Sequence, residues 1–431
     1  MKTGKMKNSQ KFKYVIIGNS YAALFAVESI RKAGSKETIA IISEEMDHTY
    51  SRAMLHEYVA DMVGDEFIYL RDFDYYQKMK VTPLLGKKVS KIDPKAKKIY
   101  IGKESIGFKK LLISTGGVPF IPPGITGLNT FKNIFTFTRK KNADKMKSAL
   151  KSVKSVVILG GGLIGLQCAE GLAHAGKKVI VVELADNILP IALDDEAARI
   201  ARQELHKQGI EIITGDTIAK INGSGGKINS VILKSKKKIP CQMVVIAVGV
   251  KPNIDFLNGS GIKTDSGILV NSGMETNIKN IYAAGDCTQA VEILSGKTMP
   301  IPIIPVASEQ GMTAGCNMAG EKKKYKGGIL LNALQFGGAQ IISYGFIRDE
   351  ANGEILKKLN DKKGIYKKII IKKNKITGAV FVRAIDRAGI FRYLIENKVD
   401  VGKYKEKLLE SDFNWAYIQN EIRDQLFTKV Q

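Results

Sequence analysis

Cysteine is scarce in this chain of 431 residues, which contains only Cys168, Cys241, Cys287 and Cys316. No two of them stand at the short spacing of a CxxC or CxxxxC motif, so the sequence excludes a disulfide scaffold, an iron–sulfur cluster and a zinc ribbon. Each cysteine lies in an apolar or glycine-rich segment, where we expect a small buried hydrophobe rather than a reactive thiol. We therefore expect no metal centre, and a cytoplasmic location.

Long apolar runs are also missing, because none reaches the roughly 18 residues that a membrane-spanning helix needs. The N-terminal stretch combines five lysines with the apolar run VIIGNSYAALFAV and superficially resembles a signal peptide. The glycine within that run favours a buried strand and a turn instead. We predict a folded chain without a membrane span, long enough for two or three domains.

Acidic residues are in the minority, with 42 Asp and Glu against 67 Lys and Arg, which gives a net charge of +25. The excess is lysine spread along the chain, without an arginine-rich arm or interleaved aromatic residues. This pattern favours solvated lysine faces and disfavours a nucleic-acid partner. The densest run lies between Lys322 and Lys375, where a docking surface for an acidic partner is the alternative.

The most informative feature is a unit that occurs twice, in Tyr14 to Gly34 and again in Ser155 to Gly176. Each copy begins with an apolar, partly β-branched run bounded by glycine, which is typical of a buried parallel strand. An alanine-rich segment of helical period follows and ends at glycine, and a second apolar strand then closes on an acid. This order predicts two βαβ units, and hence two Rossmann-like three-layer domains in an α/β protein.

The second copy carries a G-x-G-x-x-G motif at Gly160, Gly162 and Gly165. The first glycine permits a tight turn, the second lets the backbone approach a pyrophosphate, and the third allows the helix to pack closely on the strand. The pyrophosphate then binds the free N–H groups at the helix N-terminus. Glu183, at the end of the next strand, can accept both ribose hydroxyls and would repel a 2′-phosphate, which favours NADH over NADPH.

The first copy carries a looser version, GNSYAA, in which Gly18, Ser20 and Ala23 stand at the three glycine positions. Ser20 and Ala23 are small enough to keep the turn and the helix packing. Glu44 ends the next strand, and the distant segment AAGDCT places Asp286 after an apolar strand. Together these features predict a second dinucleotide site.

The ordered segments GNSYAA, TYSRAML, LLISTGG, GGGLIG, VVIAVG and IYAAGD resemble the FAD-dependent pyridine nucleotide-disulfide oxidoreductase superfamily. The resemblance covers roughly residues 10 to 320 and implies FAD at the first copy and NAD(H) at the second. Residues that it assigns to FAD are Gly18, Asn19, Ser20, Tyr21, Ala22, Ala23, Glu44, Glu45, Ser51, Arg52, Val89, Thr115, Gly116, Gly285, Asp286 and Pro305. Residues that it assigns to NAD(H) are Gly160, Gly162, Leu163, Ile164, Gly165, Glu183, Val248 and Gly249.

The resemblance also implies a discontinuous FAD domain, formed by residues 1–117 and 249–320, with the NAD(H) domain inserted at residues 118–248. The lysine-rich residues 321–431 are expected to form a small α+β domain with a terminal helix. That helix either packs on the domain or binds a partner. It is expected from the helical spacing of Trp415, Ile418, Ile422 and Leu426.

The branch within the superfamily is indicated by catalytic residues that this sequence lacks. Glutathione-type disulfide reductases carry C-x4-C in the first helix and a histidine base near the C-terminus, and this sequence has neither. Ala53 stands about where coenzyme A disulfide reductases and related NADH oxidases place a single cysteine, so thiol chemistry has no nucleophile. Tyr50, Ser51 and Arg52 match the cysteine-free branch of rubredoxin reductases and nitrite reductase large subunits. Ala53 replaces the usual proline, and Gln167 a usual glutamate.

The resemblance implies hydride transfer between nicotinamide and flavin N5. Arg52 would stabilise negative charge on the reduced flavin, unless it only forms a surface ion pair, and the Gln167 amide would bond the nicotinamide carboxamide. We expect an NADH-dependent flavoprotein that exchanges electrons with a rubredoxin- or ferredoxin-type carrier or with a partner subunit, and docks it on the lysine-rich region. Alternatives are an NADH oxidase using O2 and a flavin-dependent interaction protein with a basic nucleic-acid-binding surface. A homodimer is a further expectation.

Overall fold

The computed structural model describes residues 10–348 and 353–419, which form two compact units. The first contains the chain up to Tyr58 together with Met62–Phe120 and Val250–Gly328. The second contains Val59–Asp61, Ile121–Gly249 and the chain from Ile329 onward. Two positions of the expected terminal helix, Ile422 and Leu426, lie outside the described residues. The finer division into four segments stays a prediction.

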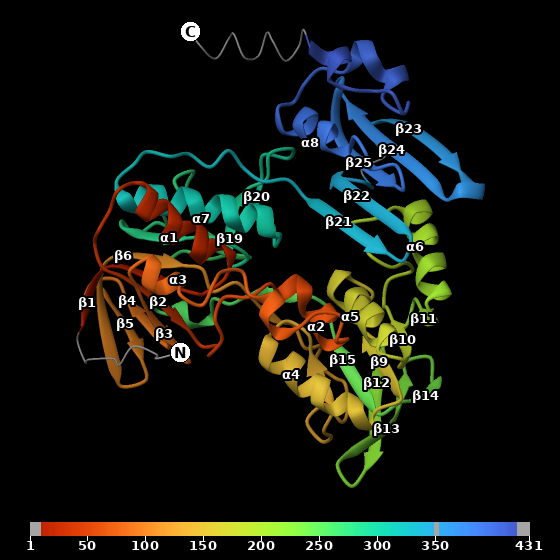
Figure 1. Cartoon of the computed structure of the whole chain (residues 1–431), viewed down its shortest axis with the longest axis horizontal. Helices are drawn as coiled ribbons and strands as arrows, with labels where there is room; N and C mark the ends of the chain where they lie inside the picture. Colours follow the sequence, from red (N-terminus) through yellow and green to blue (C-terminus); the bar gives the residue numbers. More distant parts are fainter. Residues whose placement is uncertain (1–9, 349–352, 420–431) are drawn as a thin grey trace. The chain divides into compact units, whose positions relative to one another are not determined.

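A seven-stranded sheet in the order β3-β2-β1-β6-β5-β4, with β18 also paired to β6, organises the first unit (Figure 1). The strands β1, β2, β3, β6 and β18 run parallel, as the apolar, glycine-bounded runs predict, and the β4–β5–β6 meander is antiparallel. Strand bounds are β1 Lys11–Ile17, β2 Ile39–Ser43, β3 Val81–Leu85, β4 Lys91–Asp93, β5 Lys98–Ile101, β6 Glu104–Ile113 and β18 Ile281–Ala283.

Helices and short strands complete this unit. The helices are α1 Tyr21–Lys32, η1 Arg52–Met54, α2 Leu55–Val59, η2 Asp65–Ile68, α3 Tyr75–Lys78, η4 Asp255–Leu257 and α7 Ile304–Ala319. The remaining strands are β7 Gly117–Pro119, β16 Val250–Pro252, β17 Ile268–Leu269, β19 Thr288–Val291 and β20 Thr298–Met299. Pairing of β7 with β16 joins the two points at which the chain leaves and re-enters the unit.

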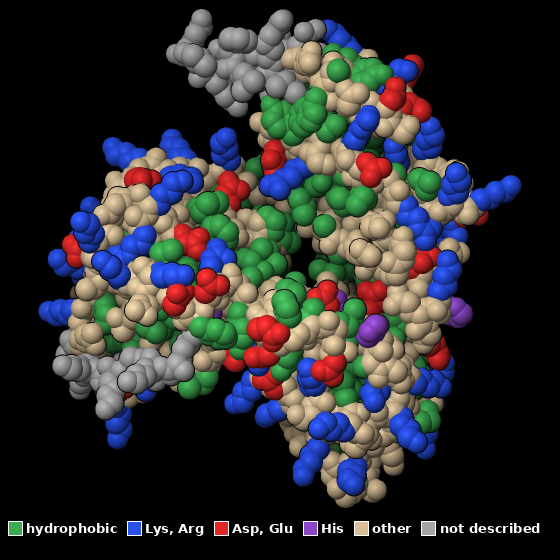
Figure 2. Space-filling model, viewed as in Figure 1, with side chains coloured by type: hydrophobic (Ala, Val, Ile, Leu, Met, Phe, Trp, Pro, Cys, Tyr) green, Lys and Arg blue, Asp and Glu red, His purple; other side chains and the backbone are tan. Residues whose placement is uncertain are grey.

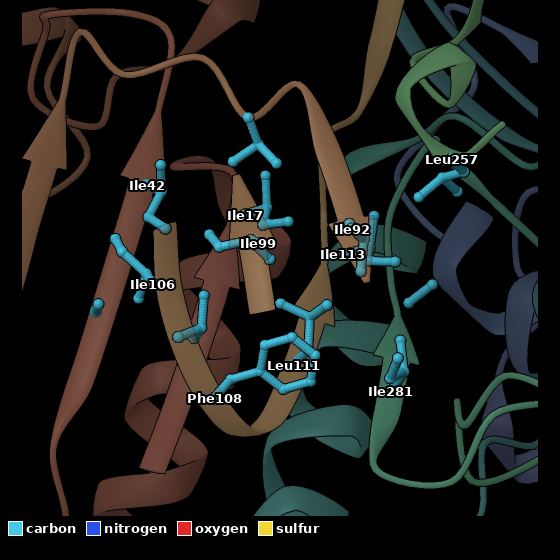
Figure 3. Close-up of a cluster of buried hydrophobic side chains, with 14 of the residues drawn as sticks. Ile17, Ile42, Ile92, Ile99, Ile106, Phe108, Leu111, Ile113, Leu257 and Ile281 are labelled. Atoms are coloured by element: carbon cyan, nitrogen blue, oxygen red, sulfur yellow. The ribbon is translucent and has the colours of Figure 1, made fainter. Parts of the chain in front are cut away.

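The core of the first unit joins strands that are far apart in the sequence. Figure 3 shows Ile17, Ile106 and Ile281 among the buried side chains that β1, β6 and β18 contribute to one cluster. Burying such side chains yields about 25 cal/mol per Å² of apolar surface. The late strand β18 is thereby fixed beside the first βαβ unit, which places the segment after it near the first glycine turn.

The helices α1 (red) and α7 (teal) lie side by side in Figure 1 and approach closely at two glycines of α7. A Cβ atom at Gly311 would lie 2.3 Å from the carbonyl oxygen of Ala22, and one at Gly315 would lie 2.4 Å from that of Ala26. Both distances are far below van der Waals contact. The two helices can therefore hold this separation only with glycine at these positions.

We predict that Gly311→Ala lowers the free energy of unfolding by about 1–3 kcal/mol, because the added methyl group forces α7 away from α1. Urea-induced unfolding measures the change. Gly389→Ala is the matched control, since Gly389 lies in the helix α8 (Ala388–Glu396) and a methyl group added there would meet no described neighbour within 4 Å. Equal stability of both variants would contradict the close packing of the two helices.

The second unit contains a parallel sheet in the order β11-β10-β9-β15-β8. Its elements are β8 Ile134–Thr136, α4 Lys140–Ala149, η3 Leu150–Ser152, β9 Ser155–Leu159, α5 Leu163–His174, β10 Lys178–Val182, α6 Asp195–Lys207, β11 Ile210–Ile213 and β15 Met243–Ile246. An antiparallel sheet of β12 Ile218–Ser224, β13 Lys227–Leu233 and β14 Lys238–Pro240 packs against it through a shared apolar core. The second copy of the repeated unit is thus a βαβ unit of a parallel sheet, as predicted.

The C-terminal part of the second unit is an antiparallel sheet in the order β21-β22-β25-β24-β23 with α8 packed on it. This confirms the expected small α+β fold. Its elements are β21 Leu331–Phe336, β22 Ala339–Gly345, β23 Glu354–Asn360, η5 Asp361–Lys363, β24 Ile365–Lys372, β25 Lys375–Val382, α8, η6 Gly402–Lys407 and η7 Trp415–Ile418.

A buried polar contact attaches this sheet to α6. Asp194, the N-cap residue of α6, accepts a hydrogen bond from Ala197 N at 3.1 Å and one from the Tyr366 hydroxyl at 2.7 Å. It also pairs at 3.2 Å with Lys368, which is fully buried. Removing one partner of such a pair leaves a buried charge and is strongly destabilising.

The cysteines lie in surroundings that can be compared with the expectation from the sequence. Three of the cysteines are buried and the fourth is half-buried, and burial raises the pKa of each thiol, to about 12 for Cys241. This environment suits small hydrophobes, as predicted.

Within residues 10–348 and 353–419, no helix has the length and apolar character needed to cross a membrane.

His48 is a buried imidazole, 3% exposed, surrounded by the rings of Tyr69, Phe73, Tyr75 and Tyr76. Its Nε2 has no hydrogen-bond partner among the described residues. Burial lowers the pKa of His48 below its ordinary value, because these surroundings do not solvate an imidazolium.

We predict a loss of stability at acidic pH that depends on His48. Above pH of about 6.5 the imidazole is neutral in both the folded and unfolded states. Below that value the unfolded chain takes up the proton first. The free energy of unfolding therefore decreases as the pH is lowered. His48→Gln should remove this part of the pH dependence in urea unfolding, whereas His206→Gln, at an exposed position, should leave it in place. Identical pH profiles for wild type and His48→Gln would refute the assignment.

Candidate nucleotide-binding sites

The loop between β1 and α1 turns on Gly18, whose φ is +123°. A Cβ atom there would lie 2.0 Å from the carbonyl oxygen of Ser114, so the turn requires glycine. Ser20 is the N-cap residue of α1 and makes no capping hydrogen bond with its side chain. Ala23 is fully buried, consistent with its expected role in helix packing. This helix N-terminus fits a pyrophosphate, which would accept hydrogen bonds from its first N–H groups.

The segment after β18 meets the first turn of α1. Gly285 has φ of +84°, and a Cβ atom there would lie 3.3 Å from the Cβ of Ala22. The Gly285 N–H donates to Oε1 of Gln310, a buried side chain of α7, at 2.8 Å. Asp286 follows directly, so the structure brings together Asp286 and the first glycine turn. Burial raises the pKa of the Asp286 carboxyl, and the charge of Arg52 opposes that rise.

Tyr50, Arg52 and Glu45 form a hydrogen-bonded cluster beside this turn. Arg52 donates to Glu45 at 2.5 Å and to the Tyr50 hydroxyl at 3.1 Å, and that hydroxyl donates to Glu45 at 2.5 Å. Tyr21, the first residue of α1, donates to Ser51 Oγ at 3.3 Å and so links the cluster to the helix. The ion pair that was the alternative for Arg52 is present, and its side chain is 42% exposed. Its charge nevertheless also acts on Asp286.

Other predicted FAD residues follow the carboxyl ends of parallel strands, which meet at one edge of the sheet. Glu44 comes directly after β2, and Thr115 with Gly116 comes after β6. The Thr115 hydroxyl donates to the carbonyl of Asn253 at 2.7 Å. Val89 is buried after β3, and Pro305 is exposed in the first turn of α7.

Asn19 in the glycine turn accepts a hydrogen bond from Tyr76 at 2.8 Å. Neither this bond nor the bond from Gly285 to Gln310 was anticipated from the sequence. A polar residue on an apolar helix carries no signal of which distant backbone group it bonds.

The three glycines of the G-x-G-x-x-G motif, at the start of α5, each have a different backbone environment. Gly160 has φ of +113°, and a Cβ atom there would lie 2.4 Å from the carbonyl oxygen of Ala247. A Cβ atom at Gly165 would lie 2.0 Å from the carbonyl oxygen of Gly160. Around Gly162, by contrast, no described atom lies within 4 Å of the Cβ position. The turn, the open approach and the close packing agree with the three roles derived from the sequence, and the site fits a pyrophosphate.

Glu183 follows β10 and its carboxylate faces the same turn. Oε2 accepts from Gly161 N at 2.5 Å, and Oε1 accepts from Ala185 N at 2.8 Å. This is the position from which an acid reaches the adenosine ribose in a Rossmann domain. Gln167 lies half-buried on α5, and Leu163 and Ile164 are half-buried in its first turn.

Val248 and Gly249 follow β15 at the point where the chain leaves this sheet, as expected for a domain crossing. The predicted NAD(H) residues therefore surround one edge of one sheet.

Residues 12–311 match the family of pyridine nucleotide-disulphide oxidoreductases. The chain belongs to this family. Residues 331–399 match the C-terminal domain of rubredoxin NAD+ reductases, which coincides with the antiparallel sheet and α8. Family membership confirms an FAD-dependent oxidoreductase that uses NAD(H), in the rubredoxin reductase and nitrite reductase branch.

Curated relatives differ in how much of their length the chain spans. Subunit epsilon of the NADH-dependent phenylglyoxylate dehydrogenase of Aromatoleum evansii is 31% identical over 404 residues, covering 92% of this chain and 94% of the relative. Nitrite reductase [NAD(P)H] of Bacillus subtilis (strain 168) is 31% identical over 396 residues, covering 91% of this chain and 48% of the relative. The chain thus spans about half the length of the nitrite reductase.

Among solved structures, NADH:rubredoxin oxidoreductase from Clostridium acetobutylicum superposes with a TM-score of 0.75 at 25% identity, covering 93% of this chain and 99% of that one. A putidaredoxin reductase in covalent complex with putidaredoxin gives a TM-score of 0.84 at 20% identity, covering 90% and 94%, and shows a shared fold. The individual site residues, a homodimer and a cytoplasmic location stay predictions.

We predict that Asp286→Asn yields protein with little bound FAD. The substitution keeps the size of the side chain but removes the carboxylate that would accept hydrogen bonds from the ribityl chain. FAD released on denaturation, divided by protein concentration, measures the effect. Asp255→Asn, at a position whose side chain is 78% exposed, is the control. Normal flavin content in Asp286→Asn would refute the assignment.

We predict that Glu183→Ala raises the Kd for NADH about tenfold or more, because a charged acceptor of ribose hydroxyls is lost. Binding of NADPH should weaken less, since the carboxylate repels its 2′-phosphate. Titration with each nucleotide measures both constants, and Glu211→Ala on β11 serves as an exposed control. Equal weakening of NADH and NADPH would remove the basis for the preference.

Proposed function

We propose that the chain transfers electrons from NADH through FAD to a protein acceptor, either a small carrier of the rubredoxin or ferredoxin type or a partner subunit of a larger oxidoreductase. The observation that carries this proposal is the pair of glycine turns at Gly18 and Gly160, each of which fits a pyrophosphate and lies at the carboxyl edge of the parallel strands of its own sheet. The C-terminal match to rubredoxin NAD+ reductases and the similarity to a dehydrogenase subunit support a protein acceptor.

The chain's residues bind and orient the two nucleotides. Bound FAD would supply the isoalloxazine ring, which exchanges a hydride with nicotinamide and single electrons with an acceptor. Asp286 and the α1 N-terminus would hold its ribityl and pyrophosphate groups, and Arg52 would offset negative charge near the ring. Gly160, Gly162 and Glu183 would hold NADH, and the Gln167 amide would bond its carboxamide.

The net reaction requires no acid or base from the protein. One NADH and two molecules of a one-electron acceptor give NAD+, one proton and two reduced acceptors. The reaction also needs no thiol, and the residue beside Arg52 is Ala53, which has none. A disulfide substrate would need a nucleophilic cysteine at this site, and we therefore propose electron transfer rather than disulfide reduction.

Anaerobic mixing with NADH tests the proposal. Protein saturated with FAD should lose its flavin absorbance within a turnover time, and addition of rubredoxin, ferredoxin or O2 should restore it at different rates. The Glu183→Ala variant, for which we predict weaker NADH binding, should need more NADH for the same loss. Retention of full absorbance in the presence of excess NADH would contradict the proposed function. Fast recovery with O2 alone would favour the NADH oxidase alternative.

A further inference from the structure

The first unit carries an acidic surface on an otherwise basic chain. Residues 37–77 form the longest stretch of the sequence without lysine, and they contain ten Asp and Glu against two Arg. In Figure 2, acidic and hydrophobic side chains lie together over the region where Figure 1 draws α2. Blue side chains are spread over most of the remaining visible surface.

Large apolar side chains are exposed within this acidic stretch. Met62 is 51% exposed, Phe67 65% and Phe73 62%. Asp65 and Glu66 are exposed directly beside Phe67. The Asp72 side chain is 87% exposed beside Phe73 and lies 3.6 Å from Nζ of Lys78, which ends the lysine-free stretch. We call these three apolar and three acidic residues the acidic–apolar patch. Apolar side chains that are grouped at a surface and rimmed by charge mark interaction sites more often than single exposed ones do.

The patch is held in place by its neighbours. The Phe73 ring contacts Tyr69 with ring centroids 5.0 Å apart, and the buried His48 at 5.7 Å. The Tyr69 hydroxyl donates to Asp65 at 3.2 Å. The Phe73 ring and the Asp65 carboxylate are therefore attached to a fixed framework, which lowers the entropy that they lose when a partner binds.

The same framework joins the patch to the expected flavin site. Ser51 N donates to the carbonyl of Ile68 at 2.7 Å, and Leu70 N donates to that of Thr49 at 3.0 Å. Between these two hydrogen bonds, the backbones of Tyr50 and Tyr69 form an isolated antiparallel β-bridge. The segment with Tyr50, Ser51 and Arg52 thus pairs directly with the segment that carries Phe67.

We propose that the acidic–apolar patch is the docking site of the electron acceptor, and that this acceptor presents a basic rim around an apolar centre. The inference rests on the proposed function, because only a protein that exchanges electrons needs to dock beside the flavin. Of the two acceptors proposed above, it selects a partner subunit with a basic contact face over an acidic carrier of the rubredoxin type. It differs from the expectation based on net charge, which places an acidic carrier on the lysine-rich region. Charges beyond about 8 Å are largely screened at physiological salt, so the charges at the contact set the sign of recognition.

Steady-state kinetics with two acceptor proteins of opposite charge tests the site. Cytochrome c serves as the basic probe and rubredoxin as the acidic one, with NADH saturating. We expect kcat/KM for cytochrome c to exceed that for rubredoxin at low salt and to fall as salt is added. The double variant Asp65→Asn/Glu66→Gln should lower kcat/KM for cytochrome c about fivefold or more at low salt. Phe67→Ser should lower it at every salt concentration, because an apolar contact is not screened.

A matched control removes two positive charges from the lysine-rich sheet. Lys362→Gln/Lys375→Gln, both at exposed positions, should leave kcat/KM for cytochrome c unchanged within a factor of two. Preference for rubredoxin at low salt, lost with added salt and in this lysine variant, would overturn the proposal and place docking on the C-terminal sheet. Unchanged kinetics with cytochrome c in the Asp65→Asn/Glu66→Gln variant would also overturn it.

Anaerobic loss of flavin absorbance with NADH, measured for every variant, separates the two levels of the hypothesis. Normal loss together with unchanged acceptor kinetics in Asp65→Asn/Glu66→Gln contradicts the docking site alone. Failure of the wild-type protein to lose absorbance contradicts the proposed function, and the docking site with it. Thermal unfolding of each variant shows whether a kinetic change reflects a loss of folded protein.

Discussion

Both sites depend on two glycines whose backbones approach a neighbouring carbonyl too closely for any side chain. Gly18 follows β1 and faces the carbonyl of Ser114, which follows β6. Gly160 follows β9 and faces the carbonyl of Ala247, which follows β15. In each sheet the strand before this carbonyl lies beside the strand before the glycine. Each turn is therefore fixed at the point where the strand order reverses, which is where open parallel sheets bind nucleotides.

This constraint explains why the sequence predicts the nucleotide turns well. Only glycine satisfies the positive φ at Gly160 and the close approach at Gly165, and the G-x-G-x-x-G spacing then identifies Gly162 as the open position between them. The acid after the next strand, Glu183, is also readable, because the carboxyl ends of parallel strands share an edge. By contrast, the bond between Gln310 and Gly285 and the pairing of Tyr50 with Tyr69 join segments whose proximity only the folded chain creates. A sequence pattern holds no local signal for such contacts.

Beside the first glycine turn, the charge of one base, Arg52, acts on two acids, Glu45 and Asp286. Asp286 is half-buried and the Glu45 side chain is mostly buried, and the charge of Arg52 acts on both. A pyrophosphate brought to this place would add negative charge. The N–H groups at the start of α1 offset that charge, since the helix N-terminus carries about half a positive charge and Ser20 does not cap it. The exposed face of Arg52 keeps part of its hydration and lowers the cost of holding it there.

Net charge and local charge therefore describe different properties of this chain. A net charge of +25 spread over lysines influences solubility and long-range approach, but it falls off over a Debye length of about 8 Å. Contact is decided by the groups that become buried, and in the proposed docking site between residues 37 and 77 ten acids stand against two arginines. A partner that matched only the total charge would meet like charges at the contact, which costs several kcal/mol in an interface. A distribution of this kind selects a partner by its contact face and not by its overall charge.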